Sequence, residues 1–291
     1  MTYQEAINKG KQCLIDNQIF DGFGFRLMLE MCDLQGINLY MDKDQIADET
    51  FIKEYFKNID RLTQHEPLAY VLGFEWFYGR RFKVNDKVLI PREETEELVG
   101  FVLSDIDTYF KDQNIVLFDI ATGSGNLGIT FKLEEPQLEV YVSDISEEAL
   151  SIAKENANNL KSGVNFLKGD MGGPFIERGL KADVLVCNPP YITTSEEVEK
   201  SVIDYEPHVA LFGGLDGLDF YRQLLDQAPQ LLNHQAMMAF EMGFNQRENL
   251  RKEIIERFPE ARIVFEKDMN GLDRMCFVYL NLPFPPDATS S

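Results

Sequence analysis

The fold is indicated by a short glycine-rich turn, Asp119-Ile120-Ala121-Thr122-Gly123-Ser124-Gly125. The turn follows an apolar, strand-like run, Ile115 to Asp119, and leads into a helical segment. Glycine residues permit positive φ angles and let a backbone approach a ligand closely. The free N–H groups at the start of the following helix can bind polar ligand atoms. The turn therefore predicts a nucleotide-like ligand at the carboxyl end of a buried strand.

Strand-length apolar segments alternate with helical segments from residue 93 to residue 282. Such alternation predicts an α/β fold, a Rossmann-like domain whose mostly parallel sheet is covered by helices on both faces. Besides the helix after the turn, we expect helices at 93–110, 146–158, 217–232 and 246–258. The expected strands are 115–119, 138–143, 164–167, 183–187, 236–241, 262–266 and 275–280.

Two segments precede this domain and one follows it. Residues 1–65 carry apolar side chains at helical spacing, for example Tyr55 and Ile59, and predict a small helical bundle. Because this bundle contains no constellation of catalytic groups, we expect it to serve packing or partner recognition. Residues 66–92 are rich in aromatic residues and bounded by glycine, which predicts a β-hairpin linker. The tail, residues 283–291, is rich in Pro and Ser and is expected to be disordered.

The composition is that of a globular protein. Hydrophobic residues make up 44% of the 291 residues, and charged residues make up 26%. The longest apolar runs are far shorter than the ~20 residues that span a bilayer, and the first residues do not resemble a secretion signal. We therefore expect a cytoplasmic protein without membrane contact. The four cysteines are scattered without C-x-x-C spacing, which indicates neither a disulfide framework nor a metal site.

The formal net charge of −21 bears on the choice of partner. A chain this acidic repels nucleic acid at long range unless a local basic patch overcomes the field. The nearest approach to such a patch is Arg80 and Arg81 with Lys83 and Lys87, and a solvated hairpin face explains these residues equally well. The charge thus favours a small molecule or a protein as the substrate.

Two more loops at the carboxyl ends of predicted strands carry side chains that suit a nucleoside. Asp144 stands where a carboxylate in nucleotide-binding folds accepts hydrogen bonds from ribose hydroxyls, although it can also cap the next helix. Asp170 can accept from an adenine amino group while Met171 packs on the ring, although an ordinary turn explains this pair equally well. The loops together favour a ligand crevice, and the lack of a Walker lysine argues against ATP.

The most informative loop follows the predicted strand at 183–187 and reads Asn188-Pro189-Pro190-Tyr191. An amide NH2 is a poor nucleophile because its lone pair is delocalised, and it needs acceptors for both hydrogens. The Asn188 side-chain oxygen and the Pro189 carbonyl can supply them, held in place by two stiff prolines. Tyr191 can pack on the planar amide and exclude water. The loop therefore predicts in-line methyl transfer to an amide or exocyclic amine nitrogen, without a strong base.

Further segments match a known family over nearly the whole chain. On these residues the chain resembles the peptide chain release factor N5-glutamine methyltransferases, the PrmC/HemK family. The Asn-Pro-Pro-Tyr motif also occurs in nucleic-acid amine methyltransferases, whereas the other segments are more specific. Beyond the glycine turn, the matching segments are 66–73, 88–92, 188–192, 205–207, 210–218 and 268–274.

The resemblance implies a small N-terminal helical domain, a hairpin linker and a class I S-adenosylmethionine-dependent methyltransferase domain with a seven-stranded sheet. The product of the cofactor would be S-adenosylhomocysteine. The residues implied to bind the cofactor are Asp119, Ala121, Thr122, Gly123, Ser124, Gly125, Asp144, Asp170, Met171 and Asn188.

The resemblance also implies a substrate, the glutamine of the Gly-Gly-Gln motif in bacterial class 1 release factors. This glutamine would dock at Asn188, Pro189, Pro190 and Tyr191, of which Asn188, Pro189 and Tyr191 would take part in catalysis. Arg92 matches the arginine of the family's linker and would orient cofactor or substrate loops.

Three sites depart from the family pattern. Glu93-Glu94 stands where the family usually has Pro-Asp, Ala121 replaces a common glycine, and Asn233-His234-Gln235 replaces a glycine pair in what we expect to be a turn. We expect these changes to affect affinity but not the reaction.

Three other functions share some of these features. A methyltransferase acting on adenine or guanine amines would use the same acceptor chemistry, but the negative charge disfavours it. A non-catalytic cofactor-binding module would not require an intact Asn-Pro-Pro-Tyr loop. The interpretation of the chain as an oxidoreductase is supported only by the Rossmann-like turn.

Overall fold

The computed structural model describes residues 1–284, so the predicted disorder from residue 285 onward lies outside the described residues. The chain divides into two compact units. Unit 1 comprises Met1–Glu75, Val84–Asp86 and Val198–Glu206, and unit 2 comprises Trp76–Lys83, Lys87–Glu197 and the chain from Pro207 onward. The predicted linker, residues 66–92, is divided between the two units.

Unit 1 is helical, as predicted. Tyr55 is fully buried at its centre and donates its hydroxyl to the Gly24 carbonyl over 3.0 Å. A Cβ at Gly10 would lie 2.3 Å from the Tyr55 hydroxyl, so glycine is required for this close packing. The helices are α1 (Tyr3–Asp16), α2 (Gly22–Leu34), α3 (Leu39–Asp42), α4 (Glu49–Thr63), α5 (Leu68–Leu72) and α10 (Lys200–Tyr205).

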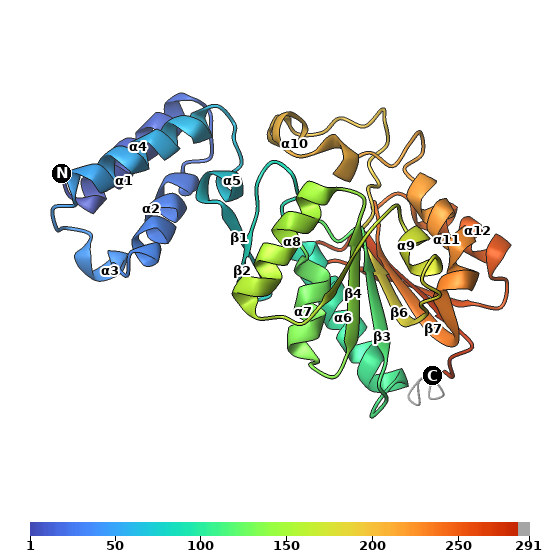
Figure 1. Cartoon of the computed structure of the whole chain (residues 1–291). Helices are drawn as coiled ribbons and strands as arrows, with labels where there is room; N and C mark the ends of the chain where they lie inside the picture. Colours follow the sequence, from blue (N-terminus) through green and yellow to red (C-terminus); the bar gives the residue numbers. More distant parts are fainter. Residues whose placement is uncertain (285–291) are drawn as a thin grey trace. The chain divides into compact units, whose positions relative to one another are not determined.

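Within the described residues, unit 2 is built around the predicted seven-stranded sheet (Figure 1). The strands are parallel except β9, which runs antiparallel to both of its neighbours. Across the sheet the order is β5 (Asn165–Lys168), β4 (Glu139–Asp144), β3 (Val116–Ile120), β6 (Ala182–Cys187), β7 (Leu232–Glu241), β9 (Asp273–Leu280) and β8 (Arg262–Lys267).

Helices cover both faces of this sheet because successive side chains of a strand point to opposite faces. In β3, Leu117 joins one buried cluster with residues of α6 (Glu93–Tyr109), α7 (Asn126–Glu134) and α8 (Glu147–Leu160). The next residue, Phe118, joins a second cluster on the other face. That cluster includes residues of α9 (Gly173–Ile176), α11 (Asp219–Leu231) and α12 (Arg247–Arg257). Figure 1 shows the two helical layers with the sheet between them.

The central strands fix where the loops of unit 2 begin. β3 and β6 are neighbours, and their register pairs Ile120 with Cys187. The chain crosses from β3 to β4 and β5 on one side, and continues through β6 and β7 on the other. The carboxyl ends of β3 and β6 therefore form a topological switch point, where α/β folds bind ligands.

Some local predictions differ from the structure. Asn233, His234 and Gln235 lie within β7 rather than in a turn, since this strand begins at Leu232. They form an irregular part of the strand, because the register with β6 shifts between the pairs Ala182–Leu232 and Val184–Met237. The short helices α9, α10 and the 3-10 turn η1 (His208–Ala210) were not predicted. Helices of three to six residues contain too few turns to show periodicity. The predicted hairpin is present as β1 (Phe74–Phe77) and β2 (Arg80–Lys83).

Among residues 1–284, no helix has both the length and the apolar character required to cross a membrane.

Candidate active site

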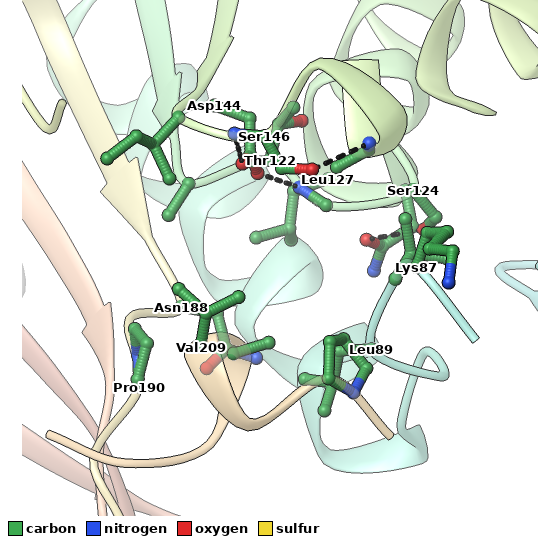
Figure 2. Close-up of a pocket in the computed structure, with 18 of the residues that line it drawn as sticks. Lys87, Leu89, Thr122, Ser124, Leu127, Asp144, Ser146, Asn188, Pro190 and Val209 are labelled. Atoms are coloured by element: carbon green, nitrogen blue, oxygen red, sulfur yellow. Dashed lines mark hydrogen bonds between the residues drawn. The ribbon is translucent and has the colours of Figure 1, made fainter. Parts of the chain in front are cut away.

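A cavity of about 220 Å³ lies in unit 2 at the switch point between β3 and β6. Its wall includes residues from the glycine turn, from the loops after β4, β5 and β6, and from the segment that leads into α6. Figure 2 shows Asp144, Thr122 and Ser124 on one side of this cavity, and Asn188 and Pro190 on another. The cavity thus joins the region predicted to hold a cofactor to the region predicted to hold a substrate amide.

The glycine turn owes its shape to Asp119, which is fully buried. Its Oδ2 accepts hydrogen bonds from the Thr122 hydroxyl over 2.5 Å and from the Gly128 N–H over 2.8 Å. Burial raises the pKa of Asp119 to about 6. Asp119 is not among the residues that line the cavity, so its place is behind the turn.

The turn presents its backbone to the cavity. Ala121, Thr122, Gly123 and Ser124 line the cavity. Ala121 and Gly123 have φ angles of 60° and 56°, in the left-handed region, and a Cβ at Gly123 would find no atom within 4 Å. Gly125 does not line the cavity; a Cβ there would lie 2.7 Å from Ile129, so this glycine permits helix packing.

Asp144 lines the cavity and accepts hydrogen bonds through both carboxylate oxygens (Figure 2). Oδ2 accepts from the Gly123 N–H, and Oδ1 accepts from the Ser146 N–H, each over 2.9 Å. Burial raises the pKa of Asp144, and these backbone donors act in the opposite direction. Each carboxylate oxygen has a second lone pair, which suits a pair of ribose hydroxyls.

The remaining cavity wall is mostly apolar. Met171 is buried and, together with Leu89, Ile145 and Phe220, lines the cavity. Asp170 also lines it, and one of its oxygens accepts from the Gln223 side-chain amide over 2.8 Å. The carboxylates of Asp144 and Asp170 fit the hydroxyls and the amine of an adenosine-containing cofactor, and the apolar wall fits its flat ring. The backbone of the glycine turn offers polar groups to the rest of such a ligand.

The Asn-Pro-Pro-Tyr loop begins directly after β6. Asn188 and Pro190 line the cavity, as does Arg92 at the start of α6, whereas Pro189 and Tyr191 do not. The Tyr191 hydroxyl donates to Oε1 of Glu241 over 3.2 Å, and burial raises the pKa of Tyr191. Tyr191 thus points its hydroxyl into the protein.

A buried glutamine that the sequence did not single out fixes this loop. The Gln246 side-chain amide donates to the Tyr191 carbonyl over 2.8 Å and to the Gly217 carbonyl over 3.3 Å. A Cβ at Gly213 would lie 2.4 Å from the Pro190 carbonyl oxygen. The glycine-rich segment 213–217 therefore packs directly against the loop, which gives a physical reason for its glycines.

Two buried polar residues near Asn188 were also missed. Thr95 in α6 and Glu241 at the end of β7 are each 2% exposed. Thr95 Oγ1 donates to Glu241 Oε2 over 2.5 Å and accepts from Asn188 Nδ2 over 3.4 Å. The sequence signal that could have identified Glu241 is its position, because it is an acidic residue at the end of the predicted apolar strand 236–241.

This fold and this cavity are those of a class I S-adenosylmethionine-dependent methyltransferase. Residues 100–205 match the methyltransferase small domain, and residues 5–73 match the PrmC N-terminal domain. The fold is shared with a methyltransferase from Pyrococcus furiosus, at 17% identity and a TM-score of 0.50, over 77% of this chain and 98% of that one. It is also shared with the hMettl16 catalytic domain, at 13% identity and a TM-score of 0.54, over 82% and 85% of the two chains.

Sequence relatives identify the family. The chain is 43% identical to the release factor glutamine methyltransferase of Bacillus anthracis, over 95% of this chain and 99% of that protein. Identity to the Bacillus cereus protein of the same name is 39% with the same coverage, and to the Bacillus subtilis protein 39% over 85% and 87%. The chain belongs to the family of release factor glutamine methyltransferases.

Proposed function

We propose that this protein methylates the side-chain amide nitrogen, N5, of the glutamine in the Gly-Gly-Gln motif of bacterial class 1 release factors. The relatives named for this activity match the chain almost from end to end, which supports the same substrate. The observation that carries the proposal is that Asn188 lines the same cavity as Asp144. An amide held by Asn188 would share this cavity with the cofactor. Because release factors act in translation termination, we place the protein in the cytoplasm.

The cofactor site comprises the glycine turn and three loops at the carboxyl ends of strands. Ala121, Thr122, Gly123 and Ser124 would receive the amino acid end, and Asp144 would accept the ribose hydroxyls. Met171 would pack on the adenine ring, with Asp170 at its amino group. Bound there, S-adenosylmethionine supplies an electrophilic methyl group on a sulfonium.

The acceptors for the glutamine amide are the Asn188 Oδ1 atom and the Pro189 carbonyl. Within residues 1–284, no side chain or backbone group donates a hydrogen bond to either oxygen. Both oxygens are therefore able to accept the two N–H hydrogens of a substrate amide. Held in this way, the nitrogen is oriented for in-line attack, and it loses its extra proton easily once it is methylated.

The other residues of the loop would shape the pocket for the glutamine. Pro190 lines the cavity and would contact the amide from the side, while Pro189 limits the rotation of the loop. Tyr191 would exclude water from the loop, and its hydroxyl is held by Glu241. Arg92 lines the cavity and would orient the substrate backbone.

The test is methyl transfer to an unmethylated class 1 release factor. After incubation with this protein and S-adenosylmethionine, mass spectrometry should find one added methyl on the glutamine of the Gly-Gly-Gln motif. A release factor with that glutamine changed to alanine should remain unmodified. Parallel reactions with tRNA and duplex DNA and a radiolabelled methyl donor address the rival substrates. Label on nucleic acid but not on the release factor would overturn the proposal.

A further inference from the structure

To accept a hydrogen from a substrate amide, Asn188 must present its oxygen, and not its NH2 group, to the cavity. The two ends of an asparagine side chain have nearly the same shape, so packing alone does not choose between them. Only one orientation places an acceptor where the glutamine amide would need it. Some neighbour of Asn188 must therefore distinguish the two ends.

Thr95 is that neighbour, and its hydroxyl has one hydrogen to donate. Glu241 Oε2 receives this hydrogen over 2.5 Å, since a carboxylate can only accept. Toward Asn188, Thr95 Oγ1 can then act only as an acceptor. Asn188 must present Nδ2 to it, as observed over 3.4 Å. The oxygen of Asn188 is thereby left for the cavity.

Glu241 is itself held in place for this role. Its Oε1 accepts from the Tyr191 hydroxyl over 3.2 Å, and its backbone carbonyl accepts from the Tyr221 hydroxyl over 2.6 Å. Burial raises the pKa of Glu241, while its hydrogen bond from Thr95 and the guanidinium of Arg274 act in the opposite direction and favour the charged form. Arg274 is in turn bonded to Asp268 over 3.2 Å. The carboxylate thus interacts with β9 and with the Asn-Pro-Pro-Tyr loop, and the backbone of Glu241 is held by α11.

We propose that Thr95 and Glu241 are positioning residues that set the orientation of the Asn188 amide through a directed chain of hydrogen bonds from Asn188 to Thr95 to Glu241. The proposal rests on the proposed function, because it concerns the acceptor for the substrate nitrogen. Glu241 determines the direction of the chain by accepting at its end. Thr95 also lines the cavity, whereas Glu241 does not, and neither residue acts as a base.

The first test compares two substitutions at position 95. Thr95→Val removes the hydroxyl but keeps the shape, so kcat should fall about tenfold, while the affinity for S-adenosylmethionine changes less than about threefold. Thr95→Ser keeps the hydroxyl and should retain kcat within about threefold. Thr130→Val is the matched control, because Thr130 is fully buried and its hydroxyl has no hydrogen-bond partner among the described residues. Its kcat should match that of the wild type.

The second test reverses the direction of the chain. In Glu241→Gln, the new amide can donate to Thr95, which can then donate to residue 188 and turn the Asn188 oxygen away from the cavity. We expect kcat to fall about tenfold. In Asn188→Asp, the new carboxylate would face the Thr95 hydroxyl. The only hydrogen of that hydroxyl is already donated to Glu241, so the carboxylate would have no donor there. The double variant Asn188→Asp with Glu241→Gln lets Thr95 donate to the carboxylate at position 188, so it should be more active than Asn188→Asp alone.

Glu241→Gln is expected to lower kcat in the wild type and to raise it in Asn188→Asp, and these opposite effects distinguish a positioning role from a role in folding. A purely structural role for Glu241 would make Glu241→Gln harmful in both backgrounds, and that result would overturn the proposal, as would a wild-type kcat in Thr95→Val. Thermal melts and S-adenosylmethionine titrations identify a variant that has not folded, and the remaining variants then decide the question. If the wild type itself leaves the release factor unmethylated, the proposed function has failed instead.

Discussion

Gln246 joins its side-chain amide to the backbone carbonyl of Tyr191 over 2.8 Å, although the two residues are 55 positions apart in the chain. The same nitrogen also reaches the Gly217 carbonyl, and Oε1 of Gln246 accepts from the Gly243 N–H over 2.9 Å. A buried carbonyl without its donor costs about 1–3 kcal/mol. Gln246 therefore holds the end of the Asn-Pro-Pro-Tyr loop against its neighbour, segment 213–217.

Gln246→Ala should lower the methyl-transfer rate about tenfold, because the loop after Asn188 loses its anchor. The affinity for S-adenosylmethionine should change much less, since Gln246 does not line the cavity. Steady-state kinetics and calorimetric titration would measure the two effects. Gln12→Ala removes an exposed side-chain hydrogen bond to Asp16 and should change neither quantity. An equal loss in rate and affinity for Gln246→Ala would contradict an anchoring role.

Gly217→Ala should abolish most activity. At this position φ is +75° and a Cβ would lie 2.2 Å from the Tyr191 carbonyl oxygen, so the loop must move. Gly36 is a matched control with φ +71° and no atom within 4 Å of its Cβ position. Gly36→Ala should share the backbone strain of about 1 kcal/mol, measured as a lower melting temperature, but should keep its methyl-transfer rate. Similar activity in the two variants would show that the approach of residue 217 to Tyr191 is unimportant.

Asp144→Asn should weaken S-adenosylmethionine binding about 10- to 100-fold. The carboxylate accepts from two backbone N–H groups and has lone pairs left for hydroxyls, whereas an amide has one acceptor oxygen. Asp183→Asn is the matched control, because Asp183 also accepts from a backbone N–H, that of Val116 over 2.8 Å, but lies outside the cofactor cavity. Its affinity for the cofactor should remain that of the wild type, as measured by calorimetry.

Ala121→Gly should raise stability by about 1 kcal/mol, because Ala121 has a φ angle of 60° that glycine adopts without strain. Chemical denaturation would measure the gain. Ala157→Gly, at a buried helical position of α8, should instead lower stability by about 1 kcal/mol or more. A loss of stability in Ala121→Gly would mean that the alanine methyl makes contacts that outweigh the strain.

Asp119 should make stability depend on pH in a recognisable way. Its pKa is about 6 in the folded protein against an ordinary value of 3.8, so the folded state binds more protons between these values. The contribution of Asp119 is then fully present below about pH 4 and is lost as the pH rises through about 6. Compared with Asp119→Asn, the wild type should lose on the order of 2–3 kcal/mol across this window. A constant difference between the two proteins, measured by denaturation at several pH values, would contradict the raised pKa.

The sheet and the loops at its edge were predictable from the sequence because each strand and each loop is formed by a run of consecutive residues with a recognisable pattern. Alternating apolar runs identify the strands, and the glycine turn and Asn-Pro-Pro-Tyr loop directly follow two of them. The bounds of elements were less predictable where a strand continues through polar residues, as Asn233 and Gln235 do in β7.

The partners of the site residues were not predictable in the same way. Thr95 and Glu241 are 146 positions apart, and only the folded sheet and α6 bring them together. Asp119 was expected at the cofactor because it precedes the turn, yet the alternation of β3 places its side chain inside the protein, where it bonds to Thr122. Sequence patterns thus located the loops, whereas long-range hydrogen bonds decide which of their atoms face the cavity.

The pairing of Ile120 with Cys187 has a geometric consequence. The next residues, Ala121 and Asn188, begin the two loops that would carry the methyl donor and the methyl acceptor. Adjacent strands lie about 4.8 Å apart, a spacing fixed by backbone hydrogen bonds and nearly independent of side chains. Under the proposed function, the backbone of the sheet would therefore set the distance between the starting points of the loops that carry the methyl donor and the methyl acceptor.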